Sequence, residues 1–214
     1  MHLQIEQLIP IPLQENVLAR ESGIWNKALS LSAPDYISIQ APSGTGKTTL
    51  IHCLYGVRTD YSGNILWQGK NLRQCSAEEL ATLRAKDLSV IFQDLRLFPE
   101  LTAWENLMVK QQLTPGIDEK EIEDWMKRLG IGHKKNAPGK TLSYGEQQRL
   151  AIIRALIQPF QFLLMDEPFS HLDQRNTQIA RELILEIVQR NKAGLLLADL
   201  DQNDFFPYHK TYTL

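Results

Sequence analysis

Residues 36–49 read YISIQAPSGTGKTT, and this stretch decides the fold of the chain. Its hydrophobic pattern predicts a short strand over 36–40 and a helix over 47–55, with Leu50 and Leu54 on the inner side of the helix. A glycine-rich loop joins the two. Because free backbone N–H groups at a helix N-terminus attract anions, this order of elements predicts an α/β fold with a phosphate site.

The APSGTGKT segment of this loop matches the pattern G-x-x-x-x-G-K-[ST] except at Ala41, which replaces the first glycine. Gly44 and Gly46 let the backbone wrap closely around a polyphosphate. We expect Lys47 to reach the β and γ phosphates and the Thr48 hydroxyl to bind Mg²⁺. A glycine turn that only caps a helix is the alternative, but the position between strand and helix favours nucleotide binding. The predicted nucleotide-binding residues are Ser43, Gly44, Thr45, Gly46, Lys47, Thr48 and Thr49.

Strand and helix signals alternate on both sides of this stretch. Strands are predicted over 62–67, 88–92, 162–165 and 195–198, and helices over 76–85 and 173–190. Ser76 and Glu79 have the spacing of a capping box, which marks the start of the first of these helices. Strands that are apolar on both faces and alternate with helices indicate a parallel sheet covered on both sides.

The middle of the chain, residues 94–158, has little β signal and contains helical patterns separated by Pro99, Pro115 and Gly130. These patterns predict a helical subdomain inserted into the α/β core. One of its helices has apolar residues at i, i+3, i+4 and i+7, which predicts a buried face. That face is formed by Ile122, Trp125, Met126 and Leu129.

The composition narrows the functional classes. The chain has 214 residues, 43% of them hydrophobic, and a formal net charge of -2. One domain with a self-sufficient core fits these values, whereas sequence-independent nucleic-acid binding normally needs a basic face. Cys53 and Cys75 lack metal-ligand spacing and suit a reducing compartment. No stretch approaches the roughly 18 apolar residues of a membrane span, and the N-terminus lacks the features of a secretory signal, so we expect a cytoplasmic protein.

Two adjacent carboxylates follow the apolar run over 162–165. Asp166 and Glu167 emerge where a buried strand ends, and Pro168 comes next. Asp166 can hold Mg²⁺ directly or through water, and Glu167 can accept the proton of an attacking water. Two solvated acids at a strand exit are the alternative. The presence of a phosphate loop in the same chain favours the catalytic interpretation.

A second anion site is predicted at LSYGEQQ, residues 142–148. Ser143 and Glu146 have the spacing of a capping box, which a purely structural helix start would also need. The Ser143 hydroxyl and the free N–H of Gly145 also form an anion site at a helix N-terminus. We therefore expect Ser143, Gly145 and Glu146 to belong to a nucleotide-binding surface.

With these three motifs in this order, essentially the whole chain resembles the ATP-binding subunit of an ABC (ATP-binding cassette) transporter. The resemblance implies a P-loop NTPase with a RecA-like parallel sheet, an N-terminal antiparallel β subdomain and an inserted helical subdomain. It implies one domain over 1–214, with an ATP-binding core of about 1–94 and 159–214 and a helical signature subdomain of about 95–158.

The resemblance also implies partners and ligands. The LSYGEQQ segment corresponds to the family signature, which closes on the ATP of a second subunit, so ATP and Mg²⁺ are the expected ligands and a head-to-tail homodimer or heterodimer is expected. Tyr144 replaces a signature glycine. Gln93 corresponds to the residue that senses Mg²⁺ and the attacking water, and the Ser170–Asp173 loop to one that crosses the dimer interface. An integral-membrane permease is the implied partner, with the subunit peripheral on the cytoplasmic face of the membrane and no nucleic-acid partner.

The segment SVIFQDLRLFPELTAWENL, residues 89–107, is similar to that of lipoprotein-releasing, macrolide-exporting and cell-division ABC ATPases. Those relatives move different cargo or transmit force, so the resemblance implies no substrate. In this family a short helix of the permease would dock near 97–104.

Two positions depart from the family pattern. Asp199 stands where the family has a switch histidine that donates toward the γ-phosphate, and an ionised aspartate would add repulsion there. Slow hydrolysis, hydrolysis rescued by another donor, and a nucleotide-gated module without hydrolysis remain open, and His171 and His209 are poor substitutes. Among the retained groups, Lys47, Gln93 and Glu167 favour hydrolysis.

The second departure concerns the base. The family's adenine-stacking aromatic is missing, because Leu18, Ala19 and Arg20 occupy its region. Arg20 could stack on the base, and Trp25 is expected in the core. Loose base selectivity follows.

Other phosphate-loop proteins fit less well. An ABC ATPase that acts on DNA or ribosomes would carry a long coiled coil or two cassettes, and a small-molecule kinase would leave LSYGEQQ unexplained.

Overall fold

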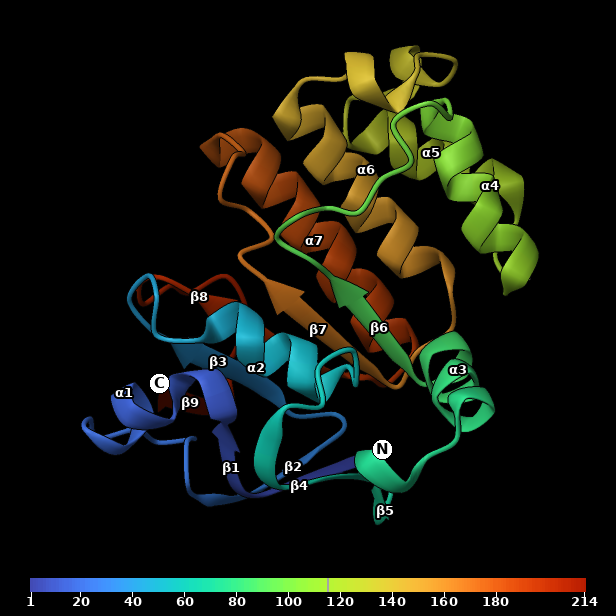
Figure 1. Cartoon of the computed structure of the whole chain (residues 1–214). Helices are drawn as coiled ribbons and strands as arrows, with labels where there is room; N and C mark the ends of the chain where they lie inside the picture. Colours follow the sequence, from blue (N-terminus) through green and yellow to red (C-terminus); the bar gives the residue numbers. More distant parts are fainter. Residues whose placement is uncertain (115) are drawn as a thin grey trace.

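The computed structural model describes residues 1–114 and 116–214. In this part of the chain, strands form two sheets, with helices packed around them (Figure 1). One sheet is antiparallel and the other is parallel. The expected α/β fold with a parallel sheet and an N-terminal antiparallel sheet is confirmed.

The antiparallel sheet contains β1 (His2–Pro10), β2 (Ala28–Ser32), β4 (Tyr61–Trp67) and β5 (Lys70–Asn71), in the spatial order β2-β1-β4-β5. The parallel sheet contains β3 (Tyr36–Gln40), β6 (Leu88–Ile91), β7 (Phe162–Asp166), β8 (Gly194–Asp199) and β9 (Lys210–Thr213), in the spatial order β6-β7-β8-β3-β9. The strands predicted from apolar runs are all present. In contrast, the pairing of β1 with β2 and β4 depends on contacts between distant segments.

The helices are α1 (Gln14–Leu18), α2 (Lys47–Leu54), α3 (Ala77–Lys86), α4 (Ala103–Leu113), α5 (Glu119–Arg128), α6 (Tyr144–Ile157) and α7 (Gln174–Arg190). The predicted capping box at Ser76 and Glu79 starts α3. Short 3-10 turns occupy Ile11–Leu13, Leu72–Gln74, Gly132–Lys134 and Gly139–Thr141. Pro115, expected to separate two helices, lies outside the described residues. None of the helices in the described part combines the length and hydrophobicity that a bilayer crossing requires.

Alternate residues of β7 face two different cores, as the strand period requires. Phe162 and Leu164 pack with α2 and the antiparallel sheet, whereas Leu163 and Met165 pack with α6 and α7. The parallel sheet is therefore covered on both faces. Figure 1 shows α2 on one side of it, and α4, α5 and α6 grouped beyond its other side.

The carboxyl ends of β3, β6, β7 and β8 lie at the same edge of the parallel sheet, because these neighbouring strands run in one direction. Each strand ends at a residue or loop that the sequence marks as functional. The buried face of α5 includes the predicted apolar residues Ile122, Trp125 and Met126. The helical region between β6 and β7 is thus anchored next to this edge through α6 and α7.

Candidate functional site

The phosphate loop leaves β3 and enters α2 at Gly46, whose φ is 108°. A Cβ atom at this position would lie 2.9 Å from Leu13 Cδ1 and 3.1 Å from Trp25 Cζ2, so conformation and space both require glycine. Gly44 is also left-handed, with φ of 79°. Ala41 does not adopt a positive φ, which explains how alanine replaces the usual first glycine.

Lys47 points back into the loop and is buried, with 5% of its surface exposed. Its Nζ donates to the Ala41 carbonyl at 2.7 Å and to the Pro42 carbonyl at 3.1 Å. The same Nζ lies 3.2 Å from Glu167 Oε1. The loop lysine and the predicted catalytic base thus form a buried ion pair, which sequence reasoning did not anticipate.

Gln93, just beyond β6, contacts two other candidates. The Thr48 hydroxyl donates to Gln93 Oε1 at 3.1 Å, and Gln93 Nε2 donates to Glu167 Oε2 at 3.3 Å. Loops after three strands therefore meet beside the start of α2. A cavity of about 220 Å³ opens here, lined by Leu13, Ser43, Gly44, Gly46, Lys47, Thr48, Thr49, Gln93 and Glu167.

Asp166, the last residue of β7, is completely buried. Among the described residues, neither of its carboxylate oxygens has a hydrogen-bond partner. Burial raises the pKa of Asp166 to about 6. The nearby Thr48 hydroxyl acts in the opposite direction and lowers the pKa of Asp166, although its own hydrogen bond goes to Gln93 Oε1. An orphaned carboxylate beside a hydroxyl and an amide oxygen is the donor set that Mg²⁺ prefers, so Asp166, Thr48 and Gln93 fit the predicted metal site.

Glu167 adopts a left-handed backbone, with φ of 46°. Its N–H donates to the Ala198 carbonyl at 2.9 Å, and its own carbonyl accepts from Gln148 Nε2 at 3.2 Å. Gln148 Oε1 in turn accepts the His171 N–H at 3.1 Å. Gln148 therefore ties α6 to the loop after β7. The sequence gives no direct signal for this role beyond the position of Gln148 in LSYGEQQ.

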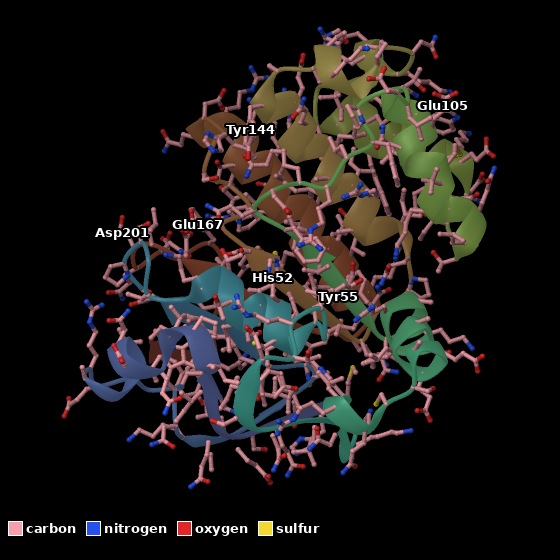
Figure 2. All side chains as sticks on the ribbon, in the orientation of Figure 1. His52, Tyr55, Glu105, Tyr144, Glu167 and Asp201 are labelled. Atoms are coloured by element: carbon pink, nitrogen blue, oxygen red, sulfur yellow. The ribbon has the colours of Figure 1, made fainter. Side chains whose placement is uncertain are left out.

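The LSYGEQQ residues lie at the start of α6, outside the cavity at the phosphate loop. Ser143 and Glu146 form the predicted capping box, and Glu146 Oε1 also lies 3.5 Å from Lys134 Nζ. A Cβ at Gly145 would lie 3.1 Å from the His171 carbonyl oxygen. In Figure 2, Tyr144 lies on the helical part and Glu167 on the sheet part of the molecule. Ser143 and Gly145 therefore do not line the cavity at the phosphate loop of their own chain.

Asp199 ends β8, and its carboxylate is held within its own loop. Oδ1 accepts from the Leu200 N–H at 2.8 Å and Oδ2 from Asn203 Nδ2 at 3.0 Å. Burial raises the pKa of Asp199, and the negative charge of Glu167 adds to this effect. Of the spare histidines, His209 accepts the Tyr36 N–H at the opposite end of β3. His171 packs edge-on against Tyr144.

The region expected for the nucleobase contains a small pocket of about 60 Å³ beside the phosphate loop. Asn16, Val17, Arg20, Trp25 and Thr45 contribute to its lining. Trp25 is 4% exposed and belongs to the core that includes β1 and α2, as predicted. Arg20 is exposed, so it is the flat group that a base could reach.

Comparison with known proteins gives a family match over residues 26–170, described as ABC transporter. The dimeric structure of MJ0796, a bacterial ABC transporter cassette, is 21% identical with a TM-score of 0.77, and the match covers 93% of this chain and 88% of that chain. The post-hydrolysis structure of the same cassette, bound to ADP and Pi, has 21% identity, a TM-score of 0.76 and the same coverage. An ATP-bound bacterial Atm1-family ABC exporter is 22% identical with a TM-score of 0.74, covering 92% of this chain and 34% of that chain.

Proposed function

The chain belongs to the ABC transporter family, and from this membership we propose that it binds and hydrolyses Mg-ATP and drives a membrane permease. The observation that carries the proposal is the convergence of Lys47, Gln93 and Glu167 around one cavity, beside the orphaned carboxylate of Asp166. A glycine turn with a structural role would not need a buried lysine or an unpartnered buried aspartate.

The contacts of Lys47 indicate how nucleotide binding would prepare the phosphate-loop site for hydrolysis. Lys47 neutralises Glu167 through this ion pair. When the β and γ phosphates enter the loop, they compete for the ammonium group and draw it from the carboxylate. Glu167 then accepts a proton from the water whose oxygen bonds to the γ-phosphorus, as the bond from that phosphorus to the β-phosphate oxygen breaks and ADP leaves. Gln93 keeps its hydrogen bond to the same carboxylate. Asp166, Thr48 and Gln93 would hold Mg²⁺, which supplies neutralisation of phosphate charge.

A head-to-tail dimer follows from the separation of the two anion sites on one chain. Ser143 and Gly145 lie outside the cavity of their own phosphate loop, so we infer that they complete the site of a second subunit. Either two copies of this chain or this chain and a related subunit would form two such composite sites. The phosphate-contacting groups of each site are then the loop residues 43–49 on one subunit and Ser143 and Gly145 on the other, while the Glu146 carboxylate caps the helix that presents them.

The chain between β6 and α4, residues 92–102, is called the Gln93 loop. A groove beside this loop supports a permease contact. Its volume is about 260 Å³, and its lining includes Phe98, Val109 and Leu113 with Arg96 and Arg154. Phe98 is 51% exposed and Leu113 is 74% exposed. We infer that a short permease segment with apolar and acidic side chains docks here, which would place the subunit on the cytoplasmic face of the membrane.

Phosphate release from the purified chain with Mg-ATP tests the proposal. Glu167→Gln should reduce the turnover number at least 100-fold while ATP binding persists, because the amide cannot accept the proton. The same variant should form a stable dimer with ATP, seen by size-exclusion chromatography with light scattering. Glu182→Gln, which changes a carboxylate on α7, is the matched control. Equal turnover of Glu167→Gln and the parent would remove Glu167 from the base role.

Asp199 favours a second candidate, a nucleotide-gated module with little or no hydrolysis. Its carboxylate cannot donate a hydrogen bond while ionised, and it adds negative charge near the phosphates. The two candidates differ in a single measurement. Tight ATP binding and dimerisation without turnover by the parent chain, also in the presence of its permease, would select the gated module.

A further inference from the structure

Tyr144 connects the start of α6 with the Gln93 loop of the same chain. Its hydroxyl donates to the Gln93 carbonyl oxygen at 3.2 Å. Its ring packs edge-on against His171, with centroids 4.2 Å apart and an interplanar angle of 67°. A glycine at this position, as in the family signature, has no side chain for either contact. The link is therefore a property of this chain's own sequence.

The other end of α6 holds the same loop. Arg154 is partly buried and donates to the Leu95 carbonyl at 2.5 Å and to the Arg96 carbonyl at 2.6 Å. Tyr144 and Arg154 are separated by about 15 Å along the helix axis, as their spacing of ten residues requires. Helix α6 thus binds three backbone carbonyls of a four-residue segment, residues 93–96.

The backbone of this segment needs such support. Leu95 and Arg96 have φ values of 56° and 51°, so two consecutive non-glycine residues are left-handed. Side chains disfavour this conformation, and it persists only where surrounding contacts hold it. The Arg96 guanidinium also stacks on the Phe92 ring at 3.7 Å. Contacts from α6 therefore hold the backbone of this segment as it leaves β6.

We propose that Tyr144 is a positioning residue that fixes Gln93 against Thr48 and Glu167. Tyr144 would thereby couple the signature loop of one chain, residues 142–148, to that chain's own hydrolysis site. The proposal rests on the proposed function. In the dimer, the signature loop that carries Tyr144 faces the nucleotide of the second subunit. A shift of this loop on meeting that nucleotide would move the Gln93 carbonyl, so each site would report its occupancy to the other.

Tyr144→Phe removes the hydroxyl and keeps the ring, so it isolates the hydrogen bond. Loss of one hydrogen bond should lower the turnover number about fivefold. Gln93 contacts Glu167, which acts on the attacking water and not on ATP binding. The KM for ATP should therefore change less than twofold. The Hill coefficient for ATP should fall toward 1, a change that general destabilisation would not produce. Tyr36→Phe, at the opposite end of β3, is the matched control and should keep parental values.

Hydrogen exchange of residues 93–98 without nucleotide tests the contact independently of hydrolysis. Tyr144→Phe and Tyr144→Gly should exchange faster in this segment than the parent, and Tyr36→Phe should not, with melting temperatures confirming that all variants are folded. Faster exchange with no turnover by the parent would support the contact while refuting the proposed hydrolysis. Unchanged exchange, or a lower turnover number with an unchanged Hill coefficient, would overturn the positioning role.

Discussion

The ionised form of Asp166 is disfavoured, because its carboxyl is buried and lacks a hydrogen-bond partner among the described residues. Burial raises its pKa from 3.8 to about 6, so the folded protein binds more protons than the unfolded chain between these values. The free energy of unfolding therefore falls as the pH rises through this window.

Asp166→Asn should consequently raise the free energy of unfolding at pH 7.5 by roughly 1 to 3 kcal/mol, because the neutral amide avoids the buried charge. At pH 4 most of the gain should be lost, since the aspartate is then protonated in the folded protein. Urea unfolding at the two pH values measures both effects, with Asp204→Asn as the exposed control. A lower stability of the variant at pH 7.5 would show that the buried charge is compensated.

At the same scale, Asp199 is predicted to slow hydrolysis through its charge. Its raised pKa has the same physical origin, burial, with Glu167 adding to it. Asp199→Asn should raise the turnover number about three- to tenfold at pH 7.5, since unit charges near 4 Å repel by about 1 kcal/mol even in water. As the pH is lowered, Asp199 takes up a proton, so the ratio of variant to parent should approach 1.

Phosphate release at several pH values from 6 to 8.5 measures that ratio, which cancels titrations common to both proteins. Asp201→Asn, a neighbouring exposed carboxylate in the same loop (Figure 2), is the control for net charge. A lower turnover number for Asp199→Asn would instead indicate that the carboxylate itself takes part in the reaction.

At the scale of elements, local patterns predicted what local forces determine. The strand and helix around the phosphate loop, the capping boxes and the apolar face of α5 need only neighbouring residues, and their positions agree with the structure. The bond from Tyr144 to Gln93 spans 51 residues, and that from Arg154 to Arg96 spans 58. Such contacts depend on how α6 packs beside β6, which periodicity does not encode. The left-handed Glu167 is likewise set by its hydrogen bonds to Ala198 and Gln148.

We expect the short helix α1 and the residues after it to determine base recognition. Trp25 is buried beneath Gly46, so the exposed flat group of the neighbouring pocket is Arg20. A guanidinium stacks on any purine, and we therefore expect GTP to compete with ATP within about tenfold, or roughly 1.4 kcal/mol. Displacement of a fluorescent ATP analogue measures both affinities. Arg20→Ala should weaken both nucleotides about equally, and Lys120→Ala on α5 neither; a thousandfold preference for ATP would contradict this view.

At the scale of the whole molecule, we expect the parallel sheet to carry the proposed chemistry and the helical part to carry the contacts that transmit it. The Gln93 loop belongs to both, because its amide contacts Thr48 and Glu167 while its continuation forms the groove around Phe98. A permease segment in this groove would therefore lie next to the residues that respond to nucleotide. On the proposed function, a change at the phosphates would reach the permease through this loop, without any contact between the phosphates and the membrane.

The groove also predicts which surface substitutions separate docking from ATP binding. Phe98→Glu or Leu113→Glu should weaken co-purification of the membrane subunit at least tenfold, because each places a charge in an apolar contact with an acidic segment. ATP affinity should change less than twofold, since neither residue lines the phosphate cavity. Ile11→Glu is the matched control, as Ile11 is 59% exposed and lies in the turn before α1. Unchanged co-purification of both variants would exclude this groove as the permease contact, whereas loss with the control as well would indicate a general effect of added charge.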